Sequence, residues 1–209
     1  MPTTLRIYLE HGQKKVFASA LDWPGWARSG RSDELAIDEL LAYAERYAEV
    51  AVRAGVRFPA GHDVDVVDRV PGSMTTDFGA PAVPSVLDDE PLTATARKRQ
   101  VALMRAAWDL LEDVAASAPE QLTKGPRGGG RDRDEVVDHV RGAERAYARK
   151  LGVSHPPFRT DAEVRAMRED LATALLAGRT EGPWPAAYGI RRITWHVLDH
   201  AWEIQDKSS

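Results

Sequence analysis

Two histidines one helical turn apart are the residues whose types and spacing most directly suggest chemistry in this sequence. His196 and His200 are four positions apart, which places both imidazoles on one face of a helix. Zinc sites of the H-E-x-x-H type use the same spacing, although the glutamate of that motif is absent here. Ile193, Val197 and Ile204 share this face, so the imidazoles interrupt an apolar stripe and need hydrogen-bond partners or a metal ion.

A third histidine lies in another segment with helical periodicity. Val136, His139, Val140 and Tyr147 share one predicted face, which directs His139 inward and makes Tyr147 a candidate pocket residue. Facing helices of a bundle build metal sites from such side chains, and three histidines leave coordination positions open. Together the three histidines predict a divalent-metal site, and the sequence does not choose among zinc, nickel, iron and manganese, because imidazole suits several of them. The alternative is that they are hydrogen-bonded to neighbours without a metal.

Several charged residues near these histidines are candidate supporting groups. Asp138 and Asp199 could each accept a hydrogen bond from a ligand histidine, the alternative being ordinary solvent-facing acids. Glu144 is a weaker candidate for a general base, because its spacing places it off the inward face. Arg191 and Arg192 could hold an anionic substrate, or lie at the mouth of a bundle and pair with surface acids.

A basic, glycine-rich loop precedes the predicted helix that carries the third histidine. It runs from Lys124 to Arg131 and lacks the G-x-x-x-x-G-K-[ST] pattern, so a Walker-type phosphate loop is excluded. Because anions bind well at helix N-termini, Arg127 and Arg131 are candidates for binding an anionic substrate or thiol cofactor. The alternative is a flexible surface loop.

The C-terminal part of the chain must supply the helices that position these residues. All four segments show apolar periodicity; Asp132 can cap the second and Thr160 opens a capping box for the third, while Pro119, Gly152 and Gly178 end the first three. Four helices in about 120 residues predict an up-down four-helix bundle. The predicted helices span 91–118, 132–151, 160–178 and 186–206.

The N-terminal part has a different pattern, with alternating strands and one helix. A hairpin, a short strand, a helix that begins after Ser32 and ends at Gly55, and a last strand indicate a small α+β module. Residues 71–91 are rich in proline, glycine, serine and threonine and show no periodicity, which predicts a linker or connecting arm. The predicted strands are 5–9, 15–21, 27–30 and 63–70. The predicted domains are 1–72 and 91–209, joined by the linker 73–90.

Three motifs of the C-terminal part resemble the DinB/YfiT-like superfamily of metal-binding four-helix bundles. They are the glycine-rich stretch 126–131, the pattern His-Val-x-Gly-Ala-Glu-x-x-Tyr at 139–147 and the pattern Arg-x-x-x-His-x-x-x-His at 192–200. The resemblance covers about residues 91–206. Arg131 and the following aspartate stand where members often have an aromatic residue and a serine.

The resemblance implies that His139, His196 and His200 bind one divalent metal ion. Some members use this metal to activate a low-molecular-weight thiol, which is transferred to small electrophiles or whose adducts are isomerised, and others have no known activity. The chain has no cysteine, so any thiol would come from outside it.

The N-terminal part is similar to the HicB-like antitoxin N-terminal fold, a small sheet with a packed helix. The similarity lies in the stretch Ala20-Leu21-Asp22-Trp23-Pro24-Gly25-Trp26, followed by Gly30 and the helix opening at Ser32. It implies a binding or oligomerisation module, since the acids lack the spacing of a two-metal nuclease.

Composition excludes several functional classes. The 209 residues carry a formal net charge of −4, which argues against a general nucleic-acid binder, and the absence of cysteine excludes disulfides and thiolate metal sites. The sequence shows neither an 18-residue apolar window nor a signal peptide, so a cytoplasmic protein without a membrane span is expected. A stripe of Trp195, Leu198 and Trp202 is expected to form core or a homodimer interface.

Two hypotheses of function follow. The first is a metal-dependent enzyme, a thiol S-transferase or a hydrolase, that uses an external thiol or water on a small-molecule substrate. The second is a non-enzymatic binding protein with a structural or vestigial metal site and a HicB-like recognition module.

Overall fold

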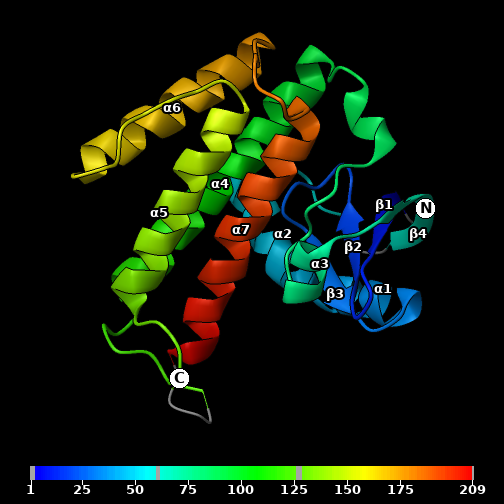
Figure 1. Cartoon of the computed structure of the whole chain (residues 1–209), viewed down its shortest axis with the longest axis horizontal. Coiled ribbons are helices and arrows are strands. Elements are labelled where there is room, and N and C mark those ends of the chain that lie inside the picture. The colour runs from blue at the N-terminus through cyan, green and yellow to red at the C-terminus, as the bar shows by residue number, and fades with distance from the viewer. Residues whose placement is uncertain (1–2, 60–61, 126–128, 209) are drawn as a thin grey trace.

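A four-stranded mixed sheet followed by helices makes up the computed structural model, which describes residues 3–59, 62–125 and 129–208 (Figure 1). The sheet order is β3-β2-β1-β4. Strands β1 and β2 form the predicted antiparallel hairpin, and β1 pairs in parallel with β4, which follows β2, β3 and two helices along the chain. The strands are β1 (Thr3–His11), β2 (Val16–Ala20), β3 (Ala27–Gly30) and β4 (His62–Pro71).

The helical segment after β3 is divided into α1 (Asp33–Ala42) and α2 (Ala44–Arg53), where the sequence predicted one continuous helix. Ser32 begins α1 as expected, since its Oγ accepts a hydrogen bond from the Leu35 backbone N–H at 3.3 Å. The break falls at Tyr43, whose ring centroid lies 5.3 Å from that of Trp202 in α7.

Residues 71–91 contain regular structure that the sequence did not predict, namely α3 (Met74–Phe78) and the 3-10 helix η1 (Val86–Asp89). The fully buried Glu10 of β1 anchors this arm, because its carboxylate accepts hydrogen bonds from the backbone N–H groups of Ala82 and Val83 at 2.9 and 3.1 Å. Thr76 of α3 donates to the same carboxylate. A buried carboxylate must be satisfied in this way, and the arm is thereby packed against the sheet.

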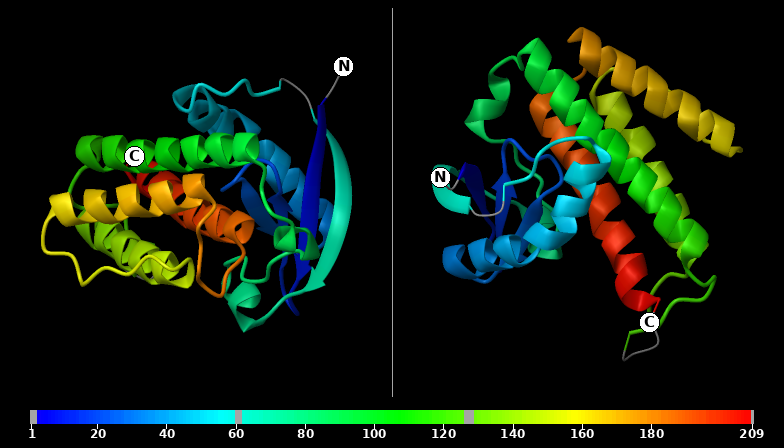
Figure 2. Two further views of the ribbon diagram at one scale, coloured as in Figure 1. Left: turned by 90° about the horizontal axis from the view of Figure 1, so that it is seen from above. Right: turned by 180° about the vertical axis from the view of Figure 1, so that it is seen from behind.

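Four long helices complete the chain close to the predicted bounds. The side chains of Thr93 and Thr160 cap the first and the third of them, and Gly178, with φ of +67°, ends the third as expected. The last helix packs against the first two, and the third packs on the outer side, away from the sheet (Figures 1 and 2). They are α4 (Ala94–Ser117), α5 (Arg133–Lys150), α6 (Asp161–Ala177) and α7 (Ala186–Lys207).

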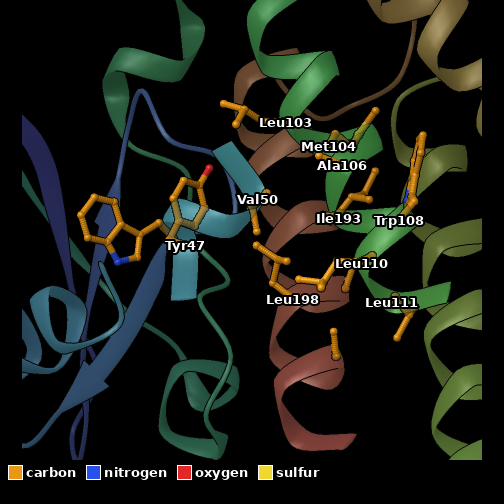
Figure 3. Close-up of a cluster of buried hydrophobic side chains, with 14 of the residues drawn as sticks. Tyr47, Val50, Leu103, Met104, Ala106, Trp108, Leu110, Leu111, Ile193 and Leu198 are labelled. Carbon is orange, nitrogen blue, oxygen red and sulfur yellow. The ribbon is translucent and has the colours of Figure 1, made fainter. Parts of the chain in front are cut away.

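One continuous apolar core joins the N-terminal module to the helices. Figure 3 shows Tyr47 and Val50 of α2 beside Leu198 of α7 and the apolar side chains of α4. The ring of Trp195 makes an edge contact with Phe17 of β2, with centroids 6.0 Å apart. The stripe expected to form core or a dimer interface is therefore core, covered by the sheet module.

Helix α7 thus has two differently occupied faces. One face is covered by the N-terminal module, with an ion pair between Arg28 and Asp199 at 2.7 Å. The other faces α5 and carries two of the three candidate histidines.

No helix within the described ranges has the length and apolar character needed to cross a membrane.

Candidate metal centre

The three histidines singled out by the sequence lie together between α5 and α7. One ring nitrogen of each of His139, His196 and His200 lies within 4.8 Å of the others, a group that could hold a metal ion. The ring centroid of His139 lies 5.1 Å from that of His196 and 5.0 Å from that of His200. Side chains from two helices thus converge on one point.

Apolar packing on both helices fixes this convergence. Val136 and Val140 are fully buried on either side of His139, so the α5 face that carries the imidazole is held against α7. On α7, Ile193 and Val197 are also fully buried and flank His196. The periodicity that predicted inward histidines is therefore the periodicity of the core itself.

Burial and neighbouring positive charge keep two of the imidazoles neutral. The pKa of His196, which is only 6 % exposed, falls to about 2, chiefly because of burial and then because of the charges of His200 and Arg192. The pKa of His139 is lowered by burial and by the charge of Arg131. A neutral imidazole is the form that binds a metal ion, so both are prepared for ligation.

The donor atoms fit a divalent metal ion of the imidazole-binding class. The Nδ1 of His196 is buried and has no hydrogen-bond partner within the described ranges, which is costly unless a ligand satisfies the ring. The Nδ1 of His200 contacts the Glu203 Oε2 at 2.6 Å, which leaves its Nε2 available. Three imidazole nitrogens without sulfur are compatible with several of the metals zinc, nickel, iron and manganese.

Glu203 is the carboxylate that supports this cluster, and sequence reasoning missed it. Its other oxygen, Oε1, accepts a hydrogen bond from the Lys207 Nζ at 2.5 Å, so the side chain is held from both ends. The bonds from His200 and Lys207 lower the pKa of Glu203 to about 2, which keeps it ionised. Its position three residues after His200 on one helix was the available signal.

The two aspartates proposed for this supporting role lie elsewhere. Asp199 forms its ion pair with Arg28 of the sheet module, and Asp138 is exposed on α5. Neither makes a hydrogen bond to His139 or to the histidines of α7 in the described part of the chain.

Tyr147 and Arg192 are brought next to the histidines, as the sequence suggested for pocket residues. The Tyr147 ring makes an edge contact with His196, with centroids 5.6 Å apart. The Arg192 guanidinium carbon lies 5.0 Å from the centroid of the same tyrosine ring. Both side chains therefore border the imidazole cluster on the side toward the start of α7.

The remaining candidate cations are distributed differently. Arg131 is exposed, but its charge contributes to the lowered pKa values of His139 and His196, so it is near the cluster. Arg127 lies outside the described residues. Arg191 is buried and pairs with the buried Asp88, so the expected pairing with surface acids is wrong for it.

Glu144 lies off the face of α5 that carries His139, as its spacing predicted, and it is buried against α6. It is 1 % exposed and binds the Arg168 Nη2 of α6 at 2.8 Å, and the Arg168 Nη1 also binds Glu112 of α4 at 2.7 Å. Helix α6 covers this side of α5, so two faces of α5 are interior rather than one. Glu144 ties helices together and is not a base at the histidines.

Comparison of the chain with family models, with curated proteins and with solved structures found no match. Three neutral imidazoles would leave the full charge of a divalent ion in place, which favours deprotonation of a bound thiol or water.

The buried imidazole of His196 predicts acid-sensitive stability of the metal-free protein. The pKa of His196 is 6.5 in the unfolded chain and about 2 in the native protein. Below about pH 6.5 the unfolded state therefore binds more protons than the native state, and the free energy of unfolding decreases as the pH is lowered. His196 contributes a slope of up to about 1.4 kcal/mol per pH unit. Urea unfolding of EDTA-treated protein at pH 7.5 and 5.5 should show a smaller loss in His196→Gln than in wild type, and equal losses would contradict this assignment.

Proposed function

We propose that His139, His196 and His200 bind one divalent metal ion and that the chain is a DinB-like metal-dependent enzyme. It would use an external low-molecular-weight thiol, or water, to transfer the thiol to a small substrate or to hydrolyse that substrate. The observation that carries this proposal is the convergence of three imidazoles from two helices, with their ligand atoms within 4.8 Å of one another.

The roles of the chain's own residues follow from their contacts. A divalent metal ion, when bound, lowers the pKa of a coordinated thiol or water toward neutrality. Glu203 accepts the Nδ1–H of His200 and so sets the tautomer in which Nε2 is free to bind. Burial holds His196 neutral, and the edge of the cluster at His139 and His200 is only partly buried, which allows a ligand to enter.

The architecture proposed with this function is an up-down four-helix bundle of α4 to α7, preceded by a HicB-like recognition module. Support comes from the packing of α7 on α4 and α5, and of α6 on α4 and α5. The small sheet with its two helices supports the module.

The second hypothesis, a binding protein with a structural metal site, differs in predicting that no exogenous ligand reaches the metal.

Cobalt substitution tests whether the centre is open. The metal-free protein is loaded with Co²⁺, and 2-mercaptoethanol is titrated while the near-ultraviolet and visible spectrum is recorded. We expect a new sulfur-to-metal charge-transfer band, which 2-methoxyethanol should not produce because it lacks the thiol. A cobalt spectrum that the thiol leaves unchanged would contradict a thiol-dependent activity and favour a structural metal.

A further inference from the structure

Arg192 differs from the other buried arginines in having no carboxylate partner. Three arginines are buried within the described ranges, and two of them form ion pairs, Arg168 with Glu144 and Arg191 with Asp88. Arg192 is 8 % exposed, makes no ion pair with a described residue, and its Nη1 is buried without a hydrogen-bond partner. An unpaired buried guanidinium is costly, so an anion is the group missing from its surroundings.

Two aromatic rings flank the guanidinium of Arg192. Its guanidinium carbon lies 5.0 Å from the ring centroid of Tyr147 and 4.8 Å from that of Trp195. Arg192 precedes His196 by one helical turn, and Tyr147 contacts His196. The rings stabilise the cation through their faces but leave its in-plane N–H donors free.

The acids of this region are already committed to other groups. Glu10 is close enough to interact electrostatically with Arg192, but its carboxylate accepts hydrogen bonds from Thr76, Ala82 and Val83. Glu203 is held by its own histidine and lysine partners. The exposed Arg131 adds a further positive charge near the cluster. The carboxylates of Glu10 and Glu203 are therefore engaged elsewhere, and the buried Nη1 of Arg192 has no acceptor among the described residues.

We propose that Arg192 binds the carboxylate of a small anionic ligand beside the three-histidine cluster. A planar guanidinium presents parallel N–H donors that match a carboxylate, so the expected ligand is a small organic acid rather than a neutral electrophile. Naming this ligand as the substrate rests on the proposed function. Binding of a carboxylate by Arg192 is a property of the chain that can be measured with or without a metal ion.

The test is an NMR titration of the arginine Nε–Hε signals with acetate at constant ionic strength. The signal of Arg192 is identified by its absence in Arg192→Lys, and acetamide serves as the uncharged probe of the same shape. We expect acetate to shift the Arg192 signal in a saturable way and acetamide to leave it unchanged. A wild-type Arg192 signal that acetate does not move would overturn the proposal, whether or not the variant folds.

Matched variants separate a direct contact from a general effect of charge. Acetate affinity, followed by the carboxylate ¹³C signal of labelled acetate, should fall at least about tenfold in Arg192→Met, because a charge-assisted hydrogen bond is lost. Arg192→Lys should also bind acetate more weakly, because lysine keeps the positive charge but lacks the paired N–H donors of a planar guanidinium. Arg131→Met should change the affinity little, and an equal loss in that variant would overturn a specific role for Arg192.

The same titration is run on zinc-loaded and on EDTA-treated protein, with metal content measured in each. Loss of acetate binding in Arg192→Met at unchanged zinc content supports the anchor independently of the metal. If no zinc binds, the proposed function fails while acetate binding by the metal-free chain still decides the role of Arg192.

Discussion

The His196→Ala, His200→Ala double variant is expected to lose the metal ion that we predict for the wild-type protein. Two of the three converging imidazoles disappear, and the single histidine left on α5 cannot hold a divalent ion against buffer and water. Elemental analysis by ICP-MS, on protein purified without an affinity tag, should find about one divalent ion per wild-type chain and less than about a tenth of that in the variant.

Two control variants show whether the loss of metal is specific to the three-histidine cluster. His155→Ala removes a histidine that pairs with Asp170 outside the cluster, so its metal content should equal that of wild type. Glu203→Gln keeps all three ligands but weakens the orientation of His200, and it should lower metal affinity by about 10–100-fold. If wild type holds no metal ion and takes none up on titration, the metal-centre hypothesis is wrong.

Trp26→Ala is expected to destabilise the whole protein by about 3–5 kcal/mol. Trp26 is 1 % exposed, stacks on Tyr47 with ring centroids 5.4 Å apart, and donates its indole N–H to the Leu40 carbonyl at 2.7 Å. It belongs to the core that continues into α4 and α7, so the loss is shared by both halves of the chain. The lower free energy of unfolding should be measured by urea unfolding, followed by circular dichroism at 222 nm and by tryptophan fluorescence.

The matched control removes an aromatic ring from the surface. Phe78 of α3 is 85 % exposed, and Phe78→Ala should change the free energy of unfolding by no more than about 0.5 kcal/mol. With one shared core, the two spectroscopic transitions should coincide in wild type and in Trp26→Ala. Two separated transitions, only one of which moves in Trp26→Ala, would show instead that the sheet module and the helices unfold independently.

Local patterns in the sequence were sufficient for most helices and strands. The last four helices and the hairpin follow from apolar periodicity, N-cap residues and glycine stops, all of which act within a few residues. The break at Tyr43 could not be predicted in this way, because the ring at that position packs on Trp202, which is 159 residues away in the chain. The helix and the 3-10 turn in the arm likewise depend on hydrogen bonds to the buried Glu10 of β1.

The sequence by itself determined which histidines face inward, because His139, His196 and His200 lie on apolar faces whose period is that of a helix. Only the tertiary structure decided which groups support them. Two neighbouring aspartates were equally plausible partners, yet Asp199 is drawn to Arg28 of the sheet module, and Glu203 takes its place at His200. Arg191 and Arg192 are adjacent in sequence, yet one is paired and the other is not, because only the folded arm brings Asp88 to the first of them. Periodicity fixes the direction of a side chain, whereas the charge that meets it comes from distant segments that only the packed chain brings close.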